Sequence, residues 1–211
     1  MSFPTHFRFY FLAPLMSILV MSILAMSVLA MSVLAVGCGP RLPPKLALPN
    51  LKIVNVGAKV AGNGGQLSYV YVGEFIDIRE TSAIAVLDGK EIAPKNDVGP
   101  VVIGGVKQAL KKKGFEFSDT APVVLSGEVR NWVARVTSGF SGKVDSEASL
   151  YVEIIDPANK RIYAGVYNGF SNVESPSLGK DDVREALKTS LEEAVRQITA
   201  DAQLMELLAS F

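Results

Sequence analysis

The feature that most constrains this 211-residue chain is an apolar run near its N-terminus, because no charged residue occurs from Phe9 to Gly37. A run of more than about 18 apolar residues is long enough to cross a bilayer as a helix. A core helix would show an apolar period near 3.6, whereas here a Met-Ser-Ile/Val-Leu-Ala/Val unit repeats every five residues and leaves no polar stripe. The run therefore predicts either an export signal or a retained transmembrane anchor.

The end of this run favours an export signal that is cleaved. Four residues precede Cys38, the only cysteine of the chain: Leu34, Ala35, Val36 and Gly37. They resemble the lipobox of bacterial lipoproteins, whose cysteine receives lipid and becomes the mature N-terminus, although Ala35 stands where that family usually has Leu. The resemblance implies that residues 1–37 are a signal peptide and that Cys38 is lipidated. Because Gly39 and not Asp follows the cysteine, it also implies an outer-membrane address facing the periplasm.

Two alternatives stay open for the N-terminal region. The chain can be a single-pass inner-membrane protein with an uncleaved N-terminal helix and an unmodified Cys38. The true start can also be Met16, although the segment from there to Cys38 has no positive residue, whereas Arg8 supplies one if Met1 is correct.

Proline content then separates a linker from a folded domain. Four prolines lie between Gly39 and Asn50, so residues 38–50 are expected to form an extended tether and residues 51–211 one periplasmic domain. The chain has 21 basic and 21 acidic residues, a balance that gives no electrostatic footprint for nucleic acid.

Apolar patterning predicts an α+β domain, a two-layer sandwich with a mainly antiparallel sheet and two principal helices on one face. The expected strands are 69–78, a hairpin over 83–93 with an Asp-Gly turn, 122–136, 144–156 and 161–173. The expected helices are 98–113, 182–200 and a short terminal helix through Leu204, Met205 and Leu208. Asp97 and Asp182 are the expected N-caps, and Gly114 is the expected left-handed stop of the first helix.

Three segments resemble YajG-like bacterial lipoproteins in pattern and order: 83–117, which leads from a strand into a helix ending in Lys-Gly-Phe, 156–174 and 183–208. The likeness covers the chain from about Tyr69 to its C-terminus. That family has no established activity, so the resemblance implies an address and a fold rather than a reaction. Auxiliary lipoproteins of lipid-transport ABC systems have a comparable layout and are the alternative.

The mature domain is not expected to be an enzyme, and no metal or cofactor is expected. The only histidine, His6, lies in the predicted signal, which excludes histidine-based catalysis and ordinary zinc or haem ligation in the domain. Two short motifs are near-misses: the glycines of 99–105 lack the Lys-Ser/Thr of a phosphate loop, and 177–180 matches Ser-x-x-Lys without its partner motifs. The remaining enzymatic route is a carboxylate pair, either Asp145 with Glu147 or Glu74 with Asp77.

Tyrosines mark a candidate partner-binding face. Side chains alternate across a strand, and in each predicted strand the tyrosines fall on the phase opposite the aliphatic residues. If the aliphatic phase packs under the helices, all five tyrosines of the domain lie on the uncovered face: Tyr69, Tyr71, Tyr151, Tyr163 and Tyr167. Tyrosine suits a half-wet interface, but it is also simply common in strands. We expect this face to bind an envelope protein or a second copy.

Overall fold

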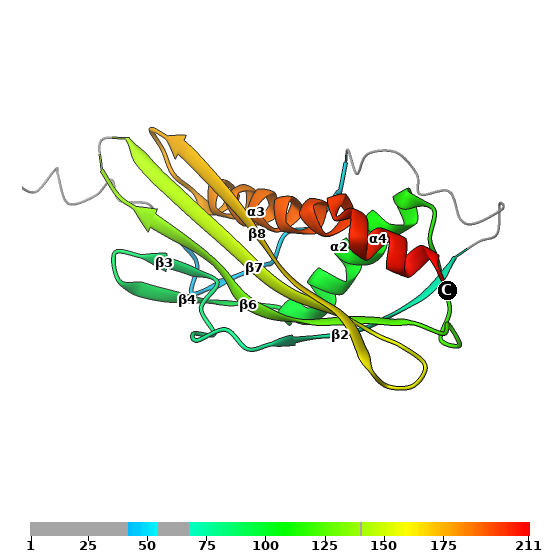
Figure 1. Ribbon diagram of the computed structural model, residues 1–211. Helices are drawn as coiled ribbons and strands as arrows, with labels where there is room; N and C mark the ends of the chain where they lie inside the picture. The colour runs from blue at the N-terminus through cyan, green and yellow to red at the C-terminus, as the bar shows by residue number, and fades with distance from the viewer. Residues whose placement is uncertain (1–41, 55–67, 140) are drawn as a thin grey trace, which may run out of the picture. The chain divides into compact units, whose positions relative to one another are not determined.

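The computed structural model describes residues 42–54, 68–139 and 141–211, which all belong to one unit, Pro40–Phe211. The predicted signal peptide, the lipobox and Cys38 lie outside the described residues. The described part contains three helices and one eight-stranded sheet (Figure 1). The helices are α2 (Val98–Lys113), α3 (Lys180–Ala200) and α4 (Ala202–Ala209). The strands are β1 (Lys45–Leu46), β2 (Tyr69–Asp77), β3 (Ala85–Leu87), β4 (Lys90–Pro94), β5 (Glu116–Phe117), β6 (Val124–Thr137), β7 (Gly142–Ile155) and β8 (Arg161–Ser175).

The sheet is mixed, so the expected mainly antiparallel arrangement is only partly correct. β6, β7 and β8 form an antiparallel meander, and β3 pairs antiparallel with β4. In contrast, β2 and β3 both pair parallel with β6, and the short β1 and β5 are also parallel to their neighbours. Parallel neighbours need a crossover connection. Here the chain passes from β2 to β6 through the β3–β4 hairpin and α2, an arrangement that strand patterns do not specify.

Turn residues produce the predicted hairpin of β3 and β4 and a second hairpin of β7 and β8. Asp88 and Gly89 have φ values of 47° and 78°, as a type I′ turn requires, and they join β3 to β4. Between β7 and β8, the Asp156 carboxylate accepts hydrogen bonds from the backbone N–H groups of Ala158 (2.9 Å) and Lys160 (2.8 Å). Asn159 takes a positive φ of 60° in this loop.

The helix ends follow the sequence in α2 and depart from it in α3. α2 has the predicted bounds and stops at Gly114 in the left-handed conformation (φ 101°), but the Asp97 side chain makes no capping hydrogen bond. α3 begins at Lys180, earlier than the predicted Asp182, and its N-cap is Gly179. The Asp182 carboxylate accepts a hydrogen bond from the Gly179 N–H (2.8 Å), so Asp182 caps the helix from within its first turn.

The three helices lie on one face of the sheet, which we call the inner face (Figure 1). α2 packs on β2, α3 packs across β8, β7 and β6, and α4 packs against α3. At the centre Trp132 is fully buried and its indole N–H donates to the Leu187 carbonyl in α3 (3.0 Å). The hydroxyls of Ser146 in β7 and Ser190 in α3 form a buried hydrogen bond of 2.9 Å.

The folded unit begins earlier in the chain than predicted. β1 pairs with β4, and Leu46 and Leu48 are buried in the same core as the helices. Part of the segment 38–50, expected as a tether, therefore belongs to the domain, because its leucines supply apolar area that the edge of the sheet can cover.

Candidate functional site: the outer face of the sheet

The candidate site is the face of the sheet opposite the helices, which we call the outer face. Pairing registers bring Ile76 of β2, Glu128 of β6, Tyr151 of β7 and Val166 of β8 into one row across four strands. Neighbouring strands lie about 4.8 Å apart, so this row is a continuous strip of side chains. Within the described residues, no helix packs on this face.

Large apolar side chains are exposed on the outer face. Phe170 is 65% exposed, Ile76 57%, and Val166 49%. Tyr69 and Tyr71 at the start of β2 are also exposed, whereas Val70 and Val72 between and beyond them are buried on the inner face. Such exposure over several neighbouring strands is typical of a surface that another molecule covers.

Tyr151 is fixed on the outer face by charged neighbours. The Arg130 guanidinium lies over its ring, 4.4 Å from the centroid, and is also paired with Glu128 (3.0 Å). The Tyr151 hydroxyl donates to Glu153 (3.2 Å) and accepts from Arg161 (3.1 Å). An aromatic ring held rigidly among arginines loses little entropy on binding, as in protein interfaces.

The placement predicted for Tyr163 and Tyr167 is wrong, because both lie on the inner face. Tyr167 is buried in the core, and the two hydroxyls are hydrogen-bonded to each other (2.8 Å). The Tyr163 hydroxyl donates to one carboxylate oxygen of Asp201 (2.6 Å), and the Tyr167 hydroxyl oxygen lies 2.9 Å from the same oxygen, so two phenolic protons serve three contacts. The other oxygen accepts the Leu204 N–H (3.0 Å) and so caps α4. The tyrosines therefore attach the C-terminal helix to β8, and Asp201 is a residue that the sequence analysis missed.

The sequence of β8 contains a signal that its tyrosines face the helices. Gly165 and Gly169 share the phase of the two tyrosines, and a Cβ at Gly169 would lie 1.9 Å from the Ser190 carbonyl oxygen of α3. Glycine is needed where a helix backbone approaches a strand this closely. Two glycines on one phase therefore mark the face that α3 covers, and Val166 and Phe170 point away from it.

Hydrogen bonding decides the charge of the Asp201 cluster. Burial alone would raise the pKa of Asp201, but hydrogen bonds from Tyr163, the Leu204 backbone and Tyr167 outweigh it and hold this pKa below its usual value. Burial, together with hydrogen bonds to Tyr163 and Asp201, raises the pKa of Tyr167. The cluster is therefore a carboxylate with two neutral phenols, which is a structural arrangement and not a proton-transfer pair.

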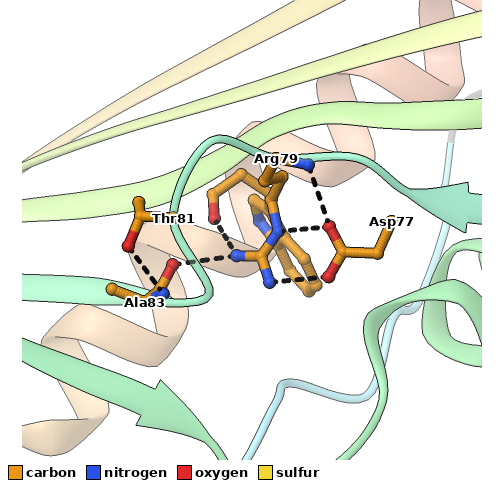
Figure 2. A network of polar contacts seen from close by, with 5 residues as sticks. Asp77, Arg79, Thr81 and Ala83 are labelled. Carbon is orange, nitrogen blue, oxygen red and sulfur yellow. Dashed lines mark hydrogen bonds and ion pairs between the residues drawn. The ribbon is translucent and has the colours of Figure 1, made fainter.

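A second polar network lies where β2 ends (Figure 2). The Arg79 guanidinium is almost fully buried and forms a two-bond pair with Asp77, Nε to Oδ1 at 2.8 Å and Nη2 to Oδ2 at 2.9 Å. Its Nη1 donates to the carbonyl oxygens of Ala83 (2.8 Å) and Trp132 (3.0 Å). The hydrogen bond from Arg79 overcomes partial burial and lowers the pKa of Asp77.

A pocket of about 310 Å³ beside this network is lined by three arginines, Arg79, Arg130 and Arg135. Two of them already have carboxylate partners, Arg79 with Asp77 and Arg130 with Glu128. The pocket is therefore not a cluster of uncompensated positive charge.

Two of the carboxylates considered as catalytic candidates, Asp145 and Asp77, form ion pairs with neighbouring basic side chains. Asp145 accepts from Lys143 and from Asn172, and the Lys143 contact contributes most to lowering its pKa, so it is an ordinary ionised surface carboxylate. In the other pair, Asp77 is bound by Arg79. A Cβ at Gly99 would lie 2.6 Å from the Phe75 carbonyl oxygen, so this glycine allows α2 to approach β2 and does not form a phosphate loop. Among the described residues, no group of three metal-ligating side chains is present.

A model of the family described as uncharacterized lipoprotein matches residues 74–209. The chain belongs to this lipoprotein family. The family description names no reaction. A search of curated proteins finds no match. In the part of the chain that the structure describes, no helix is long and apolar enough to span a membrane.

Three solved structures are similar to this chain, and the first of them shares its fold. Protein XCC0632 from Xanthomonas campestris superposes with a TM-score of 0.53 at 11% identity, covering 81% of this chain and 96% of that one. The minor lipoprotein from Acinetobacter baumannii gives 0.43 at 12% identity, covering 66% and 94%. The PelC dodecamer from Paraburkholderia phytofirmans gives 0.39 at 16% identity, covering 68% and 93%.

Proposed function

We propose that this chain is a YajG-like lipoprotein of the outer membrane, held there by lipid on Cys38 and facing the periplasm. Membership of a lipoprotein family supports this proposal. The lipobox-like residues before Cys38 favour lipidation at this cysteine. Gly39, which follows it, favours the outer membrane over the inner membrane. Each buried CH₂ of an acyl chain contributes about 0.8 kcal/mol, so two or more chains on one cysteine give stable attachment.

The mass of the intact protein extracted from membranes tests this anchor. We expect a polypeptide that begins at Cys38 and carries added acyl chains. The matched variant is Cys38→Ser, which removes the only thiol of the chain and should leave the signal uncleaved. A wild-type polypeptide that still begins at Met1, or one with a bare Cys38, contradicts the proposal.

The periplasmic domain then binds another envelope component through its outer face and catalyses no reaction. The observation that carries this part is the exposure of Tyr69, Tyr71 and Ile76 along β2, next to the row through Tyr151. Aromatic side chains and arginines are enriched at the centres of protein interfaces, and Arg130 lies on the Tyr151 ring.

Photo-crosslinking in whole cells tests this binding face. A benzophenone residue placed at Ile76 should give an adduct of defined mass, and the double change Tyr69→Ser with Tyr71→Ser should abolish it without changing thermal unfolding. The control position is Glu185 on α3, which is exposed on the opposite side of the domain and should give no such adduct. Equal adducts from both positions, or none from Ile76, contradict a binding role of the outer face.

A further inference from the structure

The strand β8 has an open edge. In the described part of the chain it pairs only with β7, so one side of its 15 residues presents backbone N–H and C=O groups to no other strand. Fifteen residues at about 3.3 Å each make an edge of roughly 50 Å. An unpaired edge of this length is a template for another strand.

Natural sheets usually protect such edges with very short strands, with charged side chains or with proline. The other end of this sheet follows that rule, since β1 and β5 are two residues long. β8 does not follow it, because no charged residue and no proline occur from Ile162 to Val173. α3 packs on the face of β8, β7 and β6 and supplies no strand to the edge of β8.

The sequence of β8 is complementary to itself in one antiparallel register. With Asn168 facing Asn168 of a second copy, Val166 lies opposite Phe170 on both sides of the two-fold axis. These two exposed side chains of the outer face, 49% and 65% accessible, then cover each other as cross-strand apolar pairs. The only charged residues of β8, Arg161 and Glu174, lie at opposite ends, so each comes next to the opposite charge of the other copy. A parallel arrangement would instead bring like charges together.

We propose that two copies of this chain associate through antiparallel pairing of their β8 strands, centred on Asn168. This contact joins the two sheets into one continuous sheet and leaves Tyr69 and Tyr71 on β2 free for a different partner. The self-association depends on neither the lipid anchor nor the binding role proposed for the β2 side.

The test is sedimentation equilibrium of the full chain, extracted from membranes in density-matched detergent, with charges placed at positions 166 and 170. The double variant V166K/F170K puts lysine opposite lysine at both pairs and should weaken association at least tenfold. The matched double variant V166K/F170E puts lysine opposite glutamate and should keep the dimer. Both change the same exposed positions, so their melting temperatures should stay close to that of the wild type.

Mixing provides an independent reading of the register. The V166K/F170K chain and a V166E/F170E chain should each be monomeric alone and should form a mixed dimer when combined. A monomeric wild type overturns the proposal, as does equal dissociation of V166K/F170K and V166K/F170E. Because Tyr69 and Tyr71 are unchanged in these variants, loss of the dimer and loss of the β2 crosslink are separate results.

Discussion

At the scale of single residues, the Arg79 guanidinium joins three segments of the domain. It pairs with Asp77 at the end of β2 and donates to the backbone of Ala83 before β3 and of Trp132 in β6. A planar group with five donors can serve all of these acceptors at once, whereas an ammonium cannot. Nothing in the local sequence pattern distinguishes this arginine from Arg130, whose pair with Glu128 is half-exposed.

The contrast between these two arginines gives a stability prediction. Arg79→Lys should lower the free energy of unfolding by about 2 kcal/mol, because buried acceptors lose charge-assisted hydrogen bonds. Arg130→Lys is the matched control and should cost less than about 1 kcal/mol, as is usual for exposed pairs. Urea unfolding of both variants measures the difference. Equal losses would mean that the Arg79 network contributes no more than a surface pair.

Asp201 gives a prediction of pH dependence. Its pKa is lower in the folded state than in the unfolded chain, so its stabilising effect is present above the unfolded value near 3.9 and is lost as pH falls through the folded value. Asp201→Asn keeps a capping oxygen for α4 but removes the charge, and it should cost about 1 kcal/mol at pH 7. The difference in melting temperature between the wild type and this variant should therefore shrink between pH 5 and about pH 3. A constant difference would contradict the role assigned to the carboxylate.

The tyrosines show what a strand pattern can and cannot decide at this scale. Alternation correctly placed Tyr69, Tyr71 and Tyr151 on the outer face. In their strands the neighbouring aliphatic residues Val70, Val72 and Leu150 fall on the other phase and are buried in the core. In β8 both phases carry apolar residues, and the acceptor of the inner tyrosines, Asp201, lies far away in sequence, so only the glycines at 165 and 169 mark the inner phase locally. Whether the outer-face tyrosines bind a partner stays a prediction.

At the scale of elements, the close packing of α3 on β8 depends on Gly169. An added Cβ would lie 1.9 Å from the Ser190 carbonyl oxygen and 2.5 Å from the Ala194 nitrogen, both of them backbone atoms that cannot move separately from the helix. The stop of α2 at Gly114 and the turn at Asp88-Gly89 were predictable because their signals are local. The distance between a helix and a strand is not a local property, and the sequence marks it only through glycine.

Two glycine substitutions with opposite expected signs test this packing. Gly169→Ala should lower the free energy of unfolding by about 2 kcal/mol or more, because α3 must shift away from the sheet. Gly104→Ala in α2 has no atom within 4 Å of its added Cβ and should raise stability by about 0.5–1 kcal/mol through helix propensity. Chemical denaturation of the two variants measures both values. Stabilisation by Gly169→Ala would contradict the close approach of α3.

At the scale of the whole molecule, the parallel pairings of β2 and β3 with β6 could not be predicted from the sequence. Parallel pairing joins residues that are distant along the chain, such as Tyr71 with Val124 and Ala85 with Ala134. The amphipathic patterns of β2, β6 and α2 are compatible with either direction of pairing. Topology is decided by how the crossover through α2 closes over the sheet, which is a property of the assembled layers.

The separation of the proposed signal peptide from the domain gives the last prediction. Nearly all the buried hydrophobic residues that the structure describes form one cluster from Leu46 to Leu208, within the unit Pro40–Phe211. A chain that begins at Pro40 should therefore fold, appear in the soluble fraction, and unfold within about 2 °C of the full chain, since no described core contact is removed. Calorimetry of the Pro40 chain and of the full chain in the same detergent measures the two unfolding temperatures. A Pro40 chain that aggregates or melts much earlier would show that residues before Pro40 contribute to the core, and that the N-terminal segment does more than target the protein to a membrane.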